Sequence, residues 1–156
     1  VVRAARINGV ADLPEIVVVP QGQRDIPAEG VLGLYRAAGW WPERTADQVR
    51  AVLRASPAVG AWHGQELIGF ARAVTDGILR AYVEDVIVAP GWRGRGVGRA
   101  LLAGLTEQLG PVPVVTLFCS PGLVPYYEAS SFKKTRQVVM HRNGPTPVTN
   151  RADGPS

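Results

Sequence analysis

The sequence has few residues that bind metals or form cross-links: one cysteine, Cys119, and two histidines among 156 residues. A single cysteine excludes an internal disulfide and suits a reducing compartment. One thiol and two imidazoles leave no cluster of the kind that holds zinc, so we expect no metal. Disulfide-rich secreted domains and zinc proteins are therefore excluded.

Long apolar runs and blocks of one charge are also missing. No apolar stretch reaches the roughly 18 residues that cross a bilayer, and no signal-peptide pattern opens the chain, so we expect a cytoplasmic location and no membrane partner. The formal net charge is +4, and the arginines are mostly spread along the chain. A nucleic-acid surface would need a basic stripe with interleaved aromatic residues, so we expect no nucleic-acid partner.

The length and the apolar content of 46% fit one globular domain. We expect this domain to span residues 1–142, followed by a flexible tail over 143–156 that is rich in proline, threonine, asparagine and glycine. No internal repeat and no second domain are visible.

Hydrophobic periodicity and turn residues predict an alternation of strands and helices. Strands are expected over 15–19, 58–63, 67–74, 79–88, 112–119 and 137–141, and helices over 28–38, 45–55, 97–109 and 123–129. The near-continuous apolar run over 112–119 predicts a strand that is buried on both faces. This order predicts an α/β fold with a mixed sheet and helices on both faces.

A glycine-rich loop joins the strand that ends at Val88 to the helix that follows, and it reads Val88-Ala-Pro-Gly-Trp-Arg-Gly-Arg-Gly-Val-Gly-Arg99. Glycines let backbone approach a ligand, and a helix start offers unpaired N–H groups to an anion such as pyrophosphate. A P-loop would need Lys-Ser/Thr where this chain has Arg99-Ala100. A dinucleotide fingerprint would need a small residue at position 99 or 101, which are Arg99 and Leu101.

The pattern Arg93-x-x-Gly96-x-Gly98 resembles the coenzyme A loop of the GNAT superfamily of N-acetyltransferases, whose signature is Gln/Arg-x-x-Gly-x-Gly/Ala. The resemblance covers most of the chain. The segment Tyr126-Tyr127-Glu-Ala-Ser-Ser131-Phe132 resembles the family's Phe-Tyr-x-x-x-Gly-Phe, with Ser131 in place of the usual glycine. The nearest subgroup resembles small acetyltransferases, some of which act on arylalkylamines.

This resemblance implies the GNAT fold, in which the fourth and fifth strands, here ending at Val88 and starting at Val112, are parallel and splay apart. It implies acetyl-CoA as cosubstrate and transfer of the acetyl group to a primary amine by direct attack in a ternary complex. The acceptor is expected to be a small molecule. The expected coenzyme A residues are Val86, Ile87, Val88, Arg93, Gly94, Arg95, Gly96, Val97, Gly98, Arg99 and Ser120.

Two adjacent carboxylates, Glu84 and Asp85, are the candidates for a base, because the attacking amine must be neutral and an alkylammonium has a pKa near 10. In a regular strand the two side chains point to opposite faces, unless a bulge re-aims one of them. The structural alternative is that one carboxylate is an edge or surface charge that pairs with Arg72 or Arg80. Deprotonation by ordered water alone also stays open.

Tyr127 is the candidate general acid, because a phenol is protonated at neutral pH and can donate to the leaving thiolate. Its position corresponds to the family's tyrosine, and closing the end of the core is the alternative role. Cys119 has no partner pattern that would support a covalent acetyl-cysteine.

Three tryptophans, Trp40, Trp41 and Trp62, fit either an aromatic wall of the acceptor site or packing, in the core or in a homodimer. Two other functions stay open beside a small-molecule acceptor. One is acetylation of a protein N-terminus or lysine, and the other is a non-catalytic acyl-CoA binding module.

Overall fold

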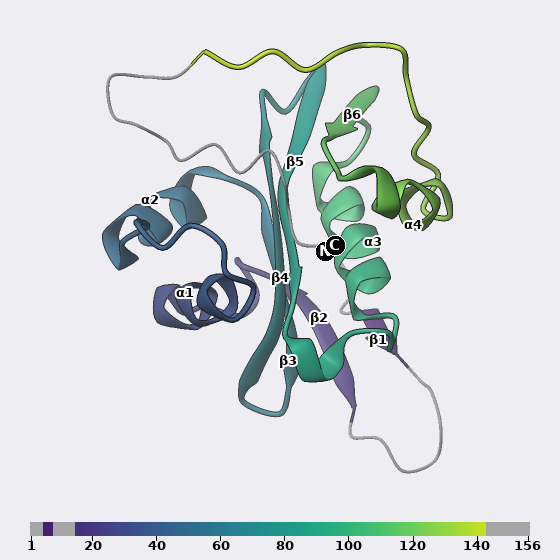
Figure 1. Ribbon diagram of the computed structural model, residues 1–156. Helices are drawn as coiled ribbons and strands as arrows, with labels where there is room; N and C mark the ends of the chain where they lie inside the picture. Colours follow the sequence, from purple (N-terminus) through teal and green to yellow (C-terminus); the bar gives the residue numbers. More distant parts are fainter. Residues whose placement is uncertain (1–4, 8–14, 143–156) are drawn as a thin grey trace. The chain divides into compact units, whose positions relative to one another are not determined.

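The computed structural model describes residues 5–7 and 15–142 (Figure 1). They fall into two compact units, divided between Leu117 and Phe118. Each unit is described by itself. The expected boundary of one domain at residue 142 stays a prediction. The tail predicted over 143–156 lies outside the described residues.

The first unit is built on a mixed sheet with the strand order β1-β2-β3-β4-β5-β6. Adjacent strands are antiparallel, except that β5 and β6 are parallel. The parallel ladder runs only from Arg80↔Val114 to Val83↔Leu117, so β5 continues to Val88 beyond it. The strands are β1 (Ala5–Ile7), β2 (Ile16–Pro20), β3 (Ala58–His63), β4 (Glu66–Thr75), β5 (Arg80–Val88) and β6 (Val114–Leu117).

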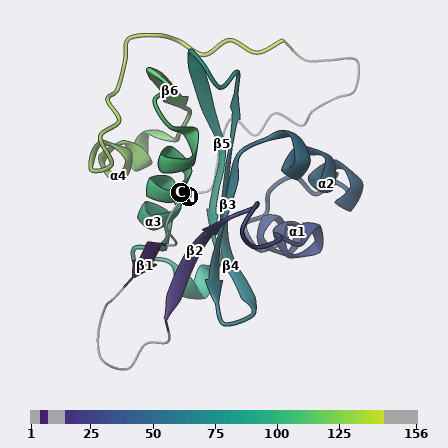
Figure 2. The same cartoon turned by 180° about the vertical axis from the view of Figure 1, so that it is seen from behind.

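Helices cover both faces of this sheet: α1 (Ala28–Ala37) and α2 (Ala46–Ala55) lie on one side and α3 (Val97–Leu109) on the other (Figures 1 and 2). Each helix turns an apolar stripe to the strands, such as Val31, Leu34 and Tyr35 of α1. On the opposite face α3 approaches closely at Gly104, where an added Cβ would lie 3.2 Å from Val18 Cγ1. The predicted mixed sheet with helices on both faces is confirmed.

Most predicted helices and strands occur within two residues of their expected bounds. The helix expected over 45–55 is α2, and it begins with a capping box at Thr45. Its hydroxyl accepts from the Gln48 N–H, and its own N–H donates to Gln48 Oε1. The first strand, β1, was not predicted, because three residues are too few to show alternation. Consequently the predicted fourth and fifth strands are β5 and β6.

Two predictions at the carboxyl end of the fold are wrong. The strand expected over 112–119 is the shorter β6, and its residues alternate between exposed and half-buried, because β6 is the last strand of the sheet. The strand expected over 137–141 is irregular backbone, with Val138 and Met140 more than four-fifths exposed. β-Branched residues favour strands only where neighbours cover them.

The second unit contains a short turn of 3₁₀ helix, η2 (Pro121–Leu123), followed by α4 (Val124–Glu128). Beyond α4 the backbone reverses at Ser131, which has a φ of 69°. The Ser131 N–H donates to the Glu128 carbonyl at 3.0 Å, and the Phe132 N–H donates to the Tyr127 carbonyl at 3.1 Å. Ser131 thus adopts the left-handed conformation that glycine supplies in the resembling motif.

Replacing Ser131 with glycine should stabilise the protein, because a left-handed conformation costs a non-glycine residue roughly 1–2 kcal/mol, partly offset by the greater freedom of glycine in the unfolded chain. We expect a net gain of about 0.5–1 kcal/mol in the free energy of unfolding, measured by urea denaturation. Ser130→Gly is the matched control and should not stabilise. Equal or lower stability of Ser131→Gly would show that the serine carries no conformational cost.

Candidate active site

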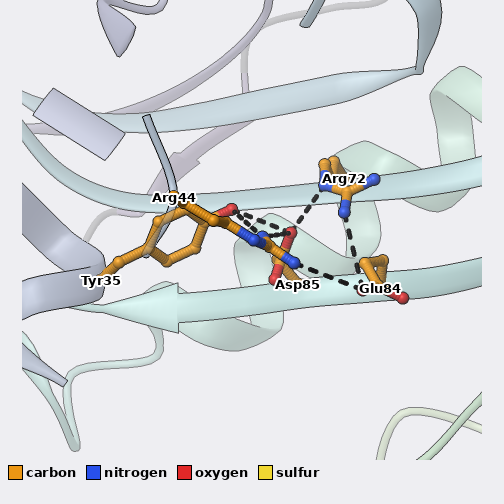
Figure 3. A network of polar contacts seen from close by, with 5 residues as sticks. All are labelled: Tyr35, Arg44, Arg72, Glu84 and Asp85. Atoms are coloured by element: carbon orange, nitrogen blue, oxygen red, sulfur yellow. Dashed lines mark hydrogen bonds and ion pairs between the residues drawn. The ribbon is translucent and has the colours of Figure 1, made fainter. Parts of the chain in front are cut away.

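A β-bulge brings two adjacent carboxylates of β5 to the same arginine. The β4–β5 register shifts between Arg72↔Asp85 and Ala73↔Val83, which leaves Glu84 as the extra residue on β5. Arg72 therefore reaches both side chains: its Nε lies 2.6 Å from Asp85 Oδ2, and its Nη2 lies 3.6 Å from Glu84 Oε1 (Figure 3). The bulge is the exception to strand alternation that the sequence analysis allowed.

Asp85 is buried, with only 1% of its surface exposed, and its Oδ2 receives two hydrogen bonds. The Tyr35 hydroxyl of α1 donates to it at 2.9 Å, and Arg72 Nε donates at 2.6 Å. A buried carboxylate needs such partners, because its desolvation is otherwise costly. Asp85 thus pairs with Arg72, as the structural alternative had it, but as a buried group rather than as an edge or surface charge.

Glu84 is less buried and less tightly held, with 22% of its side chain exposed. Two arginines approach its Oε1 without reaching hydrogen-bond distance: Arg72 at 3.6 Å and Arg44 Nη2 at 3.7 Å. The Tyr82 side chain makes a hydrogen bond with Glu84. Of the two predicted bases, Glu84 is the one with a carboxylate open to a further partner.

Burial and charge shift the titration of the groups around these carboxylates. Burial, and then the Asp85 charge, raise the pKa of the Tyr35 hydroxyl, which keeps it a proton donor to Asp85. Burial alone would lower the pKa of the Arg72 guanidinium, but Asp85, Tyr35 and Glu84 together outweigh it and raise that pKa. Arg72 therefore keeps its positive charge beside Asp85.

The glycine loop between β5 and α3 is open to a ligand. Gly94 and Gly96 have φ values of 73° and 81°, and nothing lies within 4 Å of a Cβ added at either position. Gly96 caps α3 without a side-chain hydrogen bond, and the Ala100 N–H makes the first helical bond to its carbonyl. The preceding N–H groups therefore point out of the helix end, where an anion binds.

The arginines of this loop are exposed and surround the start of α3. Arg93 donates from Nε to the Val88 carbonyl at 3.3 Å, and the Arg95 guanidinium lies 5.4 Å from the Trp92 ring centroid. Arg99 is exposed on the first turn of α3, which has no acidic residue. These positive charges favour a polyanionic ligand.

Beyond Val83 the β6 side of β5 has no pairing strand among the described residues, whereas the other side pairs Val86, Ile87 and Val88 with β4. Backbone groups that lack a partner strand can bind an extended ligand instead. The predicted coenzyme A residues of the first unit, from Val86 to Arg99, thus lie on one continuous stretch of chain. Ser120 belongs to the second unit, where its carbonyl accepts from the Leu123 N–H at 3.0 Å.

Tyr127, the predicted general acid, packs edge to face against two aromatic rings of its own unit. Its centroid lies 5.0 Å from that of Tyr126 and 6.0 Å from that of Phe132. Burial, and then the Tyr126 and Cys119 groups, raise its pKa to about 12. Cys119 is exposed rather than buried as expected, and partial burial raises the pKa of its thiol, which makes it a weak nucleophile at neutral pH.

Burial distinguishes Trp62 from the other two tryptophans that the sequence analysis named. Trp62 is buried in the core cluster, whereas Trp40 and Trp41 are half-buried and pack against the outside of that cluster. A shallow cavity of about 320 Å³ is lined by Glu15, Val17, Arg24, Trp62, His63 and Gly64, of which only Trp62 was considered for the acceptor site in the sequence analysis. Within residues 5–7 and 15–142 we find no group of side chains suited to a metal and no helix able to cross a membrane.

The sequence analysis did not identify Arg44 or Tyr35 as parts of the charged cluster. Arg44 lies between α1 and α2, and its Nη1 donates to the Tyr35 hydroxyl at 3.1 Å. A tyrosine on the apolar stripe of a helix needs a polar partner when it is buried, and that requirement could have pointed to Asp85. No sequence signal pointed to Arg44.

Comparison with known proteins places the chain among acetyltransferases. A histone acetyltransferase of Glycine max is 32% identical over 107 residues, which are 60% of this chain and 46% of that protein. A chloroplastic serotonin N-acetyltransferase of Oryza sativa subsp. japonica is 31% identical over 110 residues, 66% of this chain and 55% of that protein. The chain thus spans about half the length of the curated relatives it matches.

A solved GNAT acetyltransferase from Streptococcus pneumoniae TIGR4 shares the fold, with a TM-score of 0.67 and 24% identity. The match covers 82% of this chain and 99% of that one. The model of the acetyltransferase (GNAT) family matches residues 30–129, well over half of the chain. The chain therefore belongs to the GNAT family of acetyltransferases, as its glycine loop predicts.

Proposed function

We propose that this protein transfers the acetyl group of acetyl-CoA to the primary amine of a small molecule. The observation that carries the proposal is the glycine loop at the uncapped start of α3, next to a charged cluster on the same strand, β5. The nitrogen of the amine attacks the thioester carbonyl, the C–S bond breaks, the amine loses a proton and the thiolate gains one.

The residues of the glycine loop fit the pyrophosphate of coenzyme A. Backbone N–H groups from Gly94 to Arg99 would bind the phosphate oxygens, because the left-handed glycines leave the approach to them free. Arg93, Arg95 and Arg99 would balance the negative charge. The free edge of β5 from Val86 to Val88 would bind the amide groups of the pantetheine arm.

Replacing Gly96 with valine should weaken binding of coenzyme A by about tenfold or more, because a β-branched residue is strained at a φ of 81°. The measurement is calorimetric titration with CoA. Gly91→Val is the matched control, since Gly91 lies outside the left-handed region and an added Cβ meets open space. Unchanged affinity in a folded Gly96→Val variant would contradict the assigned site.

Glu84 is the proposed base, acting on the amine directly or through one water molecule. Asp85 already receives hydrogen bonds from Tyr35 and Arg72, whereas Glu84 is partly exposed and its two arginines lie beyond hydrogen-bond distance. Asp85 would act through the backbone, by holding the bulge that presents Glu84. Proton transfer by water alone is the competing account.

Glu84→Gln should lower kcat/KM at neutral pH by about 10²-fold, the lower end of the usual contribution of a general base. The loss should shrink toward about pH 10, where the free amine becomes abundant. Profiles of kcat/KM against pH test this, with the exposed Glu29→Gln as control. A Glu84→Gln profile parallel to wild type would favour water as the base.

Asp85→Asn should behave differently and reduce the stability of the fold. Breaking a buried ion pair leaves Arg72 uncompensated and typically costs about 3–5 kcal/mol. Urea denaturation measures this loss. An Asp85→Asn variant as stable as wild type, with the activity profile expected for Glu84→Gln, would exchange the roles of the two carboxylates.

Tyr127 is the proposed donor of the proton to the leaving thiolate, and Tyr127→Phe should lower kcat by about 10²-fold with little change in CoA affinity. Its raised pKa, about 12, keeps the hydroxyl protonated, so the loss should be constant up to about pH 10. Rate measurements with saturating acetyl-CoA test this. Tyr126→Phe is the control, and full activity of Tyr127→Phe would assign Tyr127 to packing.

The proposal of a small-molecule amine as the acceptor rests on the aromatic and acidic side chains around Arg44. These are Trp41, Tyr35, Glu84 and Asp85. Names of the relatives include both a histone and a serotonin acetyltransferase, so a protein amine is the second candidate. Release of thiol from acetyl-CoA, followed for a panel of small amines and for a lysine-containing peptide, tests the whole proposal. Turnover with the amines supports it, turnover with the peptide alone favours the second candidate, and CoA binding without turnover favours a non-catalytic module.

A cytoplasmic location also stays part of the proposal, supported by the single cysteine. The rice relative is chloroplastic by name, and cell fractionation distinguishes the two compartments. A homodimer is testable by light scattering.

A further inference from the structure

The Arg44 guanidinium lies beside the Tyr35 ring and the carboxylates of Glu84 and Asp85 (Figure 3), and the Trp41 ring is a second aromatic neighbour. The guanidinium carbon is 4.3 Å from the Trp41 ring centroid and 5.1 Å from that of Tyr35. Its Nη1 lies 3.6 Å from Asp85 Oδ2, and its Nη2 lies 3.7 Å from Glu84 Oε1. π faces and negative charge together form a site for a cation.

Arg44 is held more loosely than the other arginine of this cluster. Arg72 has 7% of its side chain exposed and makes a 2.6 Å hydrogen bond to Asp85. Arg44 has 21% exposed and makes no carboxylate contact short enough for a hydrogen bond. It also comes from an irregular segment between α1 and α2 rather than from the sheet. Arg72 is therefore held more tightly than Arg44, whose hydrogen bond in this cluster goes to the Tyr35 hydroxyl at 3.1 Å.

The charges of the cluster balance only when one cation accompanies Arg72. Glu84 and Asp85 carry two negative charges, and Arg72 and Arg44 carry two positive charges. Without Arg44 the cluster has one net negative charge, and the rings of Trp41 and Tyr35 still border the position that its guanidinium occupies. An ammonium group would balance that charge.

The backbone at Trp41 holds its indole in this place at a cost. Trp41 has a φ of 46°, a left-handed conformation that is rare for bulky residues and costs roughly 1–3 kcal/mol. Its Nε1 is buried and has no hydrogen-bond partner within the described part of the chain. Such strain persists only where surrounding contacts impose it, and it clusters at ligand sites.

We propose that the Arg44 guanidinium occupies the position of the acceptor's ammonium group and must move aside when an amine binds. Arg44 is then a specificity-determining residue, which competes with weakly held cations and admits amines that carry an aromatic or apolar group for Trp41. The inference rests on the proposed function, in which Glu84 is the base that acts on the amine. It concerns only the binding of the acceptor.

The test is calorimetric binding of three probes of similar size to the full chain: 2-phenylethylamine, 2-phenylethanol and 3-phenylpropanoate. Arg44→Gln should bind the amine about threefold to thirtyfold more tightly than wild type, the range expected of a cation–π site freed from its own cation. Affinity for the alcohol should stay unchanged. Arg44→Lys restores a cation and should return the affinity for the amine toward wild type.

Arg50→Gln is the control for charge, because Arg50 pairs with Glu29 and Asp47 on an exposed surface. It should leave all three affinities unchanged. Unchanged or weaker binding of the amine by Arg44→Gln would overturn the proposal, as would equal tightening for all three probes. Loss of 3-phenylpropanoate binding would also overturn it, by making Arg44 an anchor for an anion.

Titration with CoA alone, in the same variants, separates this inference from the proposed function. Absence of CoA binding in wild type would overturn the proposed function, while the three affinities would still decide the role of Arg44. CoA binding without the Arg44 effect would overturn only this inference.

Discussion

Arg72 and Asp85 form an ion pair on the face of the sheet that α1 covers, where both side chains are buried. A single carboxylate oxygen receives both the Arg72 guanidinium and the Tyr35 hydroxyl, so the pair ties β4 and β5 to α1. Burial makes this arrangement costly to break, although a buried pair adds little net stability over apolar residues. We propose that the ion pair contributes mainly to the conformation of β5.

That conformation is the bulge at Glu84, and the proposed chemistry depends on it. Without the bulge, Glu84 and Asp85 would point to opposite faces. With it, one carboxylate is fixed and the next remains partly exposed, facing Arg44 and Arg72. The same strand ends at Val88, where the glycine loop leads into α3. A single strand thus connects the proposed base to the proposed coenzyme A site.

Local signals predicted the elements that local physics determines. The capping box at Thr45 and the apolar stripe of α3 each specify structure within a few residues. The run over 112–119 was misjudged, because exposure of β6 depends on strands elsewhere in the sheet. Glu84 and Asp85 were recognised as a pair, but their separate roles follow from a register shift that no single strand reveals. Arg44 reaches the cluster only because the segment between α1 and α2 is placed beside β5, and no local sequence signal indicates that placement.

The central claim is that the Arg72–Asp85 pair shapes the site rather than stabilises the fold, and an apolar replacement of both residues tests it most directly. Arg72→Met and Asp85→Leu should each lose stability as single variants, whereas the double variant should regain much of it. Acetyl transfer to an amine, measured as kcat/KM in the double variant, should nevertheless stay far below wild type. A double variant with wild-type activity would contradict the claim.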